Sequence, residues 1–149
     1  MATMTIRPVR ASDFEHWLPL WEGYNAFYER EIAEAVTRTS WGRFLDPGEP
    51  VHALVADDGS GRLVGLVHYL FHRNTAMIGP VTYLQDLFAD PQTRGRGVGR
   101  ALIAAVRDAA EAAGSPRVYR MTHETNRQAR ILYDKVAKNS GFIQYRLEV

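Results

Sequence analysis

The strongest constraint on the fold is a glycine-rich turn that leads directly into a long helical pattern. The stretch RGRGVGR at 94–100 holds three glycines and three arginines, and residues 97–113 are rich in alanine and leucine, which favour helix. A Gly-Ser-Pro triplet at 114–116 ends the pattern. An apolar, β-branched run at 77–89 and a short expected strand at 117–122 flank it, so the sequence predicts a strand–helix–strand crossover with parallel strands.

The rest of the chain predicts a mixed sheet around this crossover. A Ser-x-x-Glu spacing at 12–15, typical of a capping box, indicates that a first helix begins there. Two strands joined by an Asp-Asp-Gly-Ser-Gly turn are expected to form a hairpin. We therefore expect one α/β domain over residues 1–149, with a mostly antiparallel sheet, one parallel crossover and flanking helices. The remaining expected elements are strands at 5–9, 51–56, 63–71 and 142–148, and helices at 32–45 and 126–138.

Composition narrows the functional classes. The formal net charge is +1, from 18 Lys and Arg against 17 Asp and Glu, so no global field favours nucleic acid or an anionic membrane. The sequence has no cysteine, which excludes disulfides and thiolate chemistry and suits a cytoplasmic protein. No stretch approaches the ~18 apolar residues of a membrane span, and no signal peptide is expected. His68 and His72 lie too far apart along one strand to share an ion, so we expect no metal site.

The glycine-rich turn has the properties of a phosphate-binding site. Glycines allow positive φ and close approach of the backbone, and the first N–H groups of the following helix lack intrahelical partners. Arg94, Arg96 and Arg100 add positive charge. A Walker loop is disfavoured because Arg100 and Ala101 follow Gly99, and a dinucleotide fingerprint is disfavoured because position 100 is not glycine. An unliganded turn is the alternative, although three clustered guanidinium groups would then repel one another.

Several motifs resemble those of the GCN5-related N-acetyltransferase (GNAT) superfamily. RGRGVG at 94–99 resembles its Arg/Gln-x-x-Gly-x-Gly/Ala motif, and NRQARILY at 126–133, followed by SGF at 140–142, is similar to its second motif. The opening at 6–13 is similar as well. YLQDLF at 83–88 resembles a segment of diamine (spermidine/spermine) and small histone/polyamine acetyltransferases. The resemblance covers nearly the whole chain and implies the GNAT fold, acetyl-CoA as cosubstrate and an amine as acceptor.

The resemblance also implies roles for particular residues. Tyr133 matches the general acid that protonates the departing thiolate, and it shares a helix face with Asn126 and Ala129. The strand before the turn would pair with the pantetheine chain and supply an N–H for the oxyanion. The implied cofactor-binding residues are Leu87, Phe88, Ala89, Arg94, Gly95, Arg96, Gly97, Val98, Gly99, Arg100, Asn126, Ala129 and Tyr133.

The general base and the acceptor pocket are less clearly marked. The diamine acetyltransferases have a glutamate where Gln85 stands, and an amide has no useful basicity, so Gln85 is expected only to orient the amine. Asp86 is the candidate base if a bulge turns it toward the substrate, with Glu124 or a water as alternatives. Tyr24 and Tyr28 are expected to line the pocket because aromatic faces accommodate ammonium groups, with a core role as the alternative.

Together these features predict direct acetyl transfer to a small amine. An acyl-enzyme is disfavoured because there is no cysteine and no serine in a nucleophile elbow. The expected acceptor is a polyamine or an amino-acid-like primary amine. A protein or histone-tail lysine acetyltransferase and a coenzyme-A-binding regulatory module without turnover are the alternatives. We also expect a homodimer, with the strand at 142–148 as the candidate interface.

Overall fold

A computed structural model describes residues 3–149, which form a five-stranded sheet with helices on both faces. Short 3-10 turns cover Ala11–Asp13 and Pro91–Thr93. The strands are β1 (Thr5–Pro8), β2 (Val51–Asp57), β3 (Leu63–His72), β4 (Val81–Ala89) and β5 (Val118–Arg120). The α-helices are α1 (Phe14–Phe27), α2 (Glu34–Leu45), α3 (Val98–Ala112) and α4 (Arg127–Val136).

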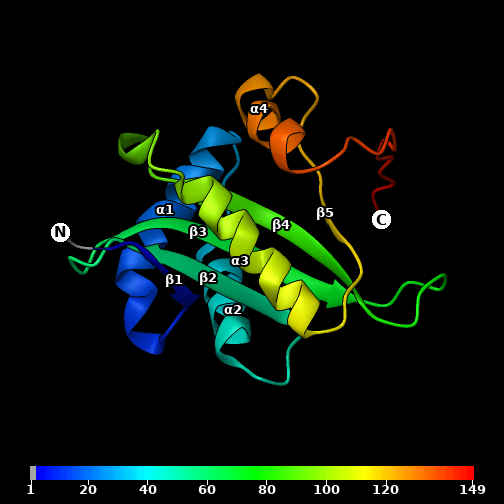
Figure 1. Ribbon diagram of the computed structural model, residues 1–149. Helices are drawn as coiled ribbons and strands as arrows, with labels where there is room; N and C mark the ends of the chain where they lie inside the picture. Colours follow the sequence, from blue (N-terminus) through cyan, green and yellow to red (C-terminus); the bar gives the residue numbers. More distant parts are fainter. Residues whose placement is uncertain (1–2) are drawn as a thin grey trace.

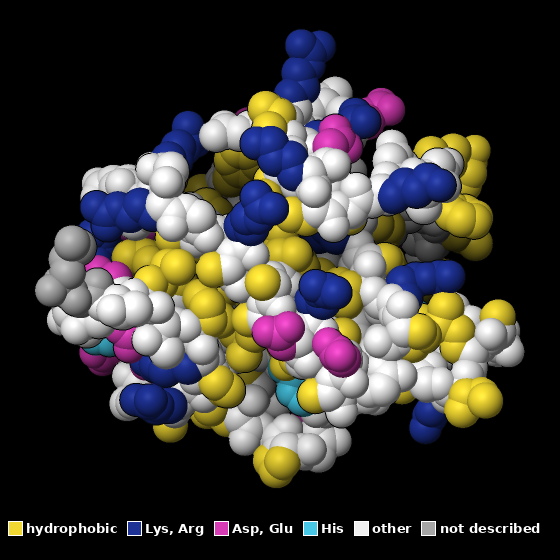
Figure 2. Space-filling view, viewed as in Figure 1, with side chains coloured by type: hydrophobic (Ala, Val, Ile, Leu, Met, Phe, Trp, Pro, Cys, Tyr) yellow, Lys and Arg dark blue, Asp and Glu magenta, His cyan; other side chains and the backbone are white. Residues whose placement is uncertain are grey.

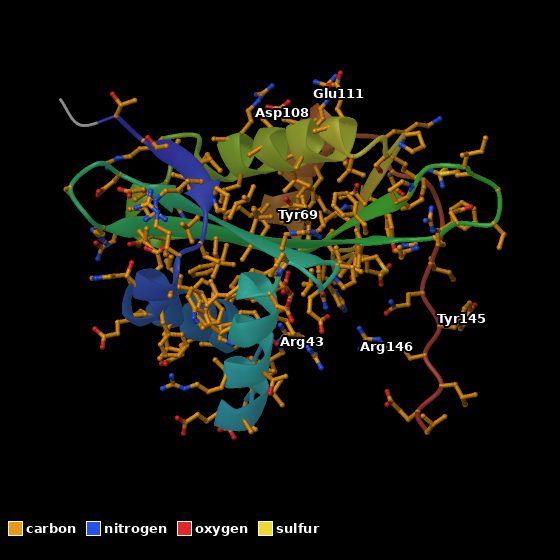
Figure 3. All side chains as sticks on the ribbon, turned by 90° about the horizontal axis from the view of Figure 1, so that it is seen from below. Arg43, Tyr69, Asp108, Glu111, Tyr145 and Arg146 are labelled. Atoms are coloured by element: carbon orange, nitrogen blue, oxygen red, sulfur yellow. The ribbon has the colours of Figure 1, made fainter. Side chains whose placement is uncertain are left out.

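The sheet has the predicted mixed topology. The strands lie in the order β1-β2-β3-β4-β5, and every neighbouring pair is antiparallel except β4 and β5, which are parallel. α3 makes the crossover between these two strands on one face of the sheet, while α1 and α2 cover the other face (Figure 1). The edge-on view in Figure 3 shows the same layers, with Asp108 and Glu111 of α3 on one side and Arg43 of α2 on the other.

α3 is fixed to the sheet by one apolar stripe. Val98, Leu102, Val106 and Ala110 recur every four residues, and all four are buried. They pack on the side chains that β2, β3 and β4 present to this face, including Leu84. This packing fixes the start of α3, and therefore the glycine-rich turn, against the end of β4.

The opposite face is packed by the aromatic residues of α1. Trp17, Trp21 and Tyr24 are all buried, and Trp17 is stacked on Trp21 at 5.8 Å between ring centroids. Trp41 of α2 closes the cluster at 4.8 Å from Trp17. Most of the aromatic stripe therefore forms core, and only Tyr28 at its end is half-buried.

Two predictions from the sequence are wrong. The spacing at 12–15 does not form the capping box; instead Asp13 accepts a hydrogen bond from the Arg10 N–H at 2.7 Å, and α1 begins at Phe14. The carboxylate of Asp13 is held there by two bonds from Arg7 at 2.8 and 3.0 Å. The strand expected at 142–148 does not form either, because this segment extends away from the sheet, as Figure 3 shows at Tyr145.

The other expected elements form with their ends moved by a few residues. The run that begins at 77 enters the sheet only at Val81, directly after Gly79 and Pro80, because a proline cannot donate to the strand ladder. Within the described residues, no helix combines the length and the apolar character that a bilayer crossing requires.

Candidate active site

The turn before α3 presents backbone N–H groups in the way the sequence predicts. Gly97 caps the helix in the left-handed conformation, at φ 73°, and Gly95 has φ 83°. The first intrahelical bond runs from the Ala101 N–H to the Gly97 carbonyl at 2.9 Å. The amides of residues 98–100 precede that bond, so they are available to an anion at the positive end of the helix dipole.

Basic side chains surround this turn. Arg94, Arg96 and Arg100 are all exposed. In Figure 2, Lys and Arg side chains lie over the start of α3, Asp and Glu lie over its later turns, and both kinds lie over α4. The combination of free amides and guanidinium groups fits a diphosphate.

A bulge on β4 turns Asp86 toward the α1 face of the sheet. His68 pairs with Asp86 and Tyr69 pairs with Leu84, so Gln85 is the extra residue on β4. Leu84 packs under α3, yet Asp86, two residues later, contacts His68 on the opposite face. Asp86 is buried and Gln85 is exposed. The bulge required for a site role of Asp86 is therefore present.

Beyond the bulge, β4 and β5 separate. β5 pairs with β4 only from Thr82 to Leu84, and within residues 3–149 no strand continues on the β5 side of the second half of β4. Leu87, Phe88 and Ala89 are therefore paired with β3 on one side only. An extended chain such as pantetheine could add here as a neighbouring strand would.

A buried hydrogen-bonded chain holds the Asp86 carboxylate. The Trp17 indole donates to Nε2 of His68 at 3.1 Å, and Nδ1 of His68 lies 2.9 Å from Oδ2 of Asp86. An indole N–H can only donate, so Nε2 accepts and the imidazole proton is on Nδ1, which donates to Asp86. Burial alone would raise the pKa of Asp86, but the bond from His68, with Tyr24 and Arg120 nearby, holds it below its ordinary 3.8. Asp86 is therefore a fixed anion.

Arg30 faces this anion from the end of α1. Its terminal nitrogen lies 3.9 Å from Oδ1 of Asp86, and its guanidinium carbon lies 5.4 Å from the ring centroid of Tyr24 and 5.9 Å from that of Tyr28. Nε donates to the side chain of Asn25 at 2.6 Å, which fixes the direction of the guanidinium. Burial, with the charge of Asp86, raises the pKa of Tyr24, so this phenol stays protonated.

On the other side of the bulge, α4 brings Tyr133 to Arg120, the last residue of β5. Nε of Arg120 donates to the Tyr133 hydroxyl at 3.2 Å. Asn126 caps α4 by accepting from the N–H of Ala129 at 3.3 Å, so this part of the second motif has a structural use as well. Glu124 is exposed, and its carbonyl accepts from Arg130.

Two open clefts adjoin these groups. One, of about 510 Å³, lies between the end of α1 and the start of α4, and the other, of about 620 Å³, lies between α1 and α2. The cleft between α1 and α4 is lined by Phe27, Tyr28, Glu29, His123, Thr125, Asn126, Arg127 and Gln128. The cleft between α1 and α2 is lined by Trp21, Glu22, Asn25, Ala26, Glu29, Arg30, Glu31, Ile32 and Thr37.

Among the residues described, no three His, Cys, Asp or Glu side chains are grouped to hold a metal ion.

Comparison with known proteins identifies the family. Residues 13–137 match the acetyltransferase (GNAT) family. The chain belongs to the GNAT family. It is an acetyl-CoA-dependent N-acetyltransferase, as its motifs predict.

Two curated N-acetyltransferases match the chain over nearly its full length. The chain is 33% identical to D-amino-acid N-acetyltransferase HPA3 of Saccharomyces cerevisiae, over 96% of this chain and 89% of the relative. It is 30% identical to the uncharacterized N-acetyltransferase YhfO of Bacillus subtilis, over 98% of each.

Solved structures agree with the GNAT fold. The aminoglycoside N-acetyltransferase AAC(6')-Iy in complex with CoA superposes with a TM-score of 0.84 at 21% identity, covering 100% of this chain and 97% of the other. A ribosomal-protein-alanine N-acetyltransferase from Brucella melitensis biovar Abortus gives 0.80 at 19% identity, covering 99% of each.

Sequence reasoning missed three polar residues that this GNAT site brings together. Arg120 stands in a short strand, Arg30 follows the end of α1, and His68 stands in an apolar strand. A polar residue in an otherwise apolar strand is the signal that could have marked His68 and Arg120, whereas Arg30 stands between Glu29 and Glu31 and no local signal marks it.

Proposed function

We propose that this N-acetyltransferase acetylates the α-amino group of a free amino acid. The observation that supports the proposal is the opposed pair of Asp86 and Arg30, 3.9 Å apart, beside Tyr24 and Tyr28. An amino acid is a zwitterion, so its ammonium matches the carboxylate and its carboxylate matches the guanidinium. The name of the relative HPA3, a D-amino-acid N-acetyltransferase, points to the same class.

The charged residues around Asp86 match a polyamine less well than they match an amino acid. Two guanidinium groups, from Arg30 and Arg120, flank the buried carboxylate of Asp86. A polyamine carries no carboxylate to pair with them, and its further ammonium groups would be repelled. The exposed glutamates of the α1–α2 cleft could attract a cation, but none of them is paired with Asp86, Arg30 or Arg120.

In the proposed reaction, the neutral amine attacks the thioester carbonyl of acetyl-CoA. The new C–N bond forms first and gives a tetrahedral oxyanion; the C–S bond then breaks, and the departing thiolate takes the proton of the Tyr133 hydroxyl. Asp86 has a lowered pKa and a bond from His68, so it suits holding the ammonium by charge better than removing its proton. The ammonium loses one proton to water before the attack, and the nitrogen of the tetrahedral adduct loses a second proton to water as the amide forms. Backbone N–H groups at 87–89 would stabilise the oxyanion.

A matched pair of substrates tests the amino-acid proposal. Thiol release from acetyl-CoA is measured with D- and L-methionine, with the corresponding methioninamides, which lack the carboxylate, and with spermidine. We expect turnover with an amino acid, and we expect Arg30→Gln to raise KM for it about tenfold or more, the size of one charge-assisted hydrogen bond. KM for the amide should not change. Arg38→Gln, which removes an exposed guanidinium of α2, is the control.

Two results would contradict this proposal. Turnover confined to spermidine would reassign the acceptor class. An equal rise of KM for the amino acid and its amide would show that Arg30 does not recognise a carboxylate.

We propose further that the chain forms a homodimer through residues 143–149, its C-terminal tail. Residues 143–149 alternate apolar and polar side chains, and Ile143, Tyr145 and Leu147 are exposed. Such a segment buries its apolar face only when another surface covers it, and a second copy supplies one. Sedimentation equilibrium should give the dimer mass for the wild type and the monomer mass for Tyr145→Asp. A monomeric wild type would rule this assembly out.

A further inference from the structure

Arg120 occupies the point where β4 and β5 separate. It is the last residue of β5 and pairs with Leu84, the residue before the bulge. Past this point the chain leaves the sheet and rises to α4, as Figure 1 shows. A side chain placed here lies between β4, the strand that carries Asp86, and α4, the helix that carries Tyr133.

The guanidinium of Arg120 connects the bulge on β4 with helix α4. Nε donates to the Tyr133 hydroxyl at 3.2 Å, and a terminal nitrogen donates to the carbonyl of Gln85, the bulged residue. Its charge also opposes the rise in the pKa of Tyr24 on α1. The two hydrogen bonds join the bulge and α4 through one side chain.

The guanidinium of Arg120 is charged at every relevant pH. Burial alone would lower the pKa of Arg120, but attraction and hydrogen bonds to Tyr133 and Tyr24 raise it above its ordinary 12.5. The positive charge of Arg120 also acts to lower the pKa of Asp86 and of Tyr83, both on β4. Asp86 is already bonded to His68, whereas Tyr133 accepts directly from Arg120.

The direction of the bond to Tyr133 matters for the chemistry. A guanidinium N–H can only donate, so the Tyr133 oxygen is the acceptor and its own proton is free for another partner. When that proton leaves, the oxygen becomes a phenolate that faces a cation. A positive charge fixed where negative charge develops lowers the barrier without reorganisation.

We propose that Arg120 is the positioning residue of the proton donor: it aims the Tyr133 hydroxyl and stabilises the phenolate that remains after proton transfer. This inference rests on the proposed role of Tyr133. In the step, the O–H bond of Tyr133 breaks, the S–H bond of coenzyme A forms, and the phenolate later regains a proton from water. The carbonyl of Gln85 accepts a second hydrogen bond from the Arg120 guanidinium and so helps to fix its position.

A double-mutant cycle tests this coupling. Arg120→Gln should lower kcat about 100-fold, the usual loss for one preorganised donor, with KM for acetyl-CoA within about threefold of wild type. In the Tyr133→Phe background the same substitution should have almost no further effect, since there is no phenolate to stabilise. Arg120→Lys keeps the charge and should recover at least tenfold of the loss. Arg117→Gln, an exposed arginine just before β5, should leave kcat unchanged.

The possible outcomes distinguish a failure of the proton-donor role of Tyr133 from a failure of the positioning role of Arg120. If Tyr133→Phe is as active as wild type, the proton-donor role fails and this inference falls with it. If Tyr133→Phe is impaired but Arg120→Gln lowers kcat by the same factor in both backgrounds, Arg120 acts only on the fold and the inference is overturned. If Arg120→Gln does not fold, an Arg120→Lys enzyme as inactive as Tyr133→Phe would also overturn it.

Discussion

The left-handed conformation of Gly97 gives the sharpest test of the turn that precedes α3. Gly97→Ala forces a Cβ into φ 73°, which costs about 1–2 kcal/mol for an L-residue. The added atom would meet nothing within 4 Å, so no steric clash contributes. For a chain of this length, that loss corresponds to a fall in Tm of about 2–8 °C. Gly97→Asn should lose less, because asparagine tolerates this conformation.

Gly42 provides a matched control for the same chemical change. It lies inside α2, where an added Cβ also meets nothing within 4 Å, but its φ is not positive. Gly42→Ala should therefore stabilise the protein by about 0.5–1 kcal/mol. Thermal and urea unfolding followed by tryptophan fluorescence measures both variants. Shifts of the same sign, or a Gly97→Ala protein as stable as wild type, would refute the reasoning.

Two further predictions concern the core and the response to acid. Leu102→Ala removes a fully buried side chain of α3 and should cost about 2.7–5 kcal/mol in urea unfolding; a cost below about 1 kcal/mol would contradict the packing. The bonds from Arg7 lower the pKa of Asp13 below 3.8, so their stabilisation is complete above that pH and is lost as pH falls through the lowered pKa. Asp13→Asn should therefore lose less stability than wild type between about pH 5 and pH 2, and identical losses would disprove the assignment.

Local sequence patterns predicted the crossover and the turn because both are encoded by neighbouring residues. Glycines at fixed spacing and the Ala/Leu-rich stretch after them specify a turn and a helix without reference to the rest of the chain. The start of β4 at Val81 follows in the same way from the Gly79-Pro80 pair. These elements carry the cofactor half of the candidate site.

The acceptor half depends on contacts between residues that are distant in the sequence. The bulge at Gln85 is a register shift between β3 and β4, so the sequence could state it only as a condition for a role of Asp86. The contact between Arg120 and Tyr133 requires the separation of β4 and β5, which no local pattern encodes. The tail has the alternation of a strand, but alternation does not say whether a partner exists.

Binding of coenzyme A at the start of α3 is the central claim, and titration calorimetry tests it most directly. Wild type should bind both coenzyme A and acetyl-CoA, and affinity should fall as salt rises. Arg94→Ala, Arg96→Ala and Arg100→Ala should each weaken binding, whereas Arg107→Ala, which removes an exposed arginine farther along α3, should not. No heat with either ligand, or an equal loss in Arg107→Ala, would contradict the account.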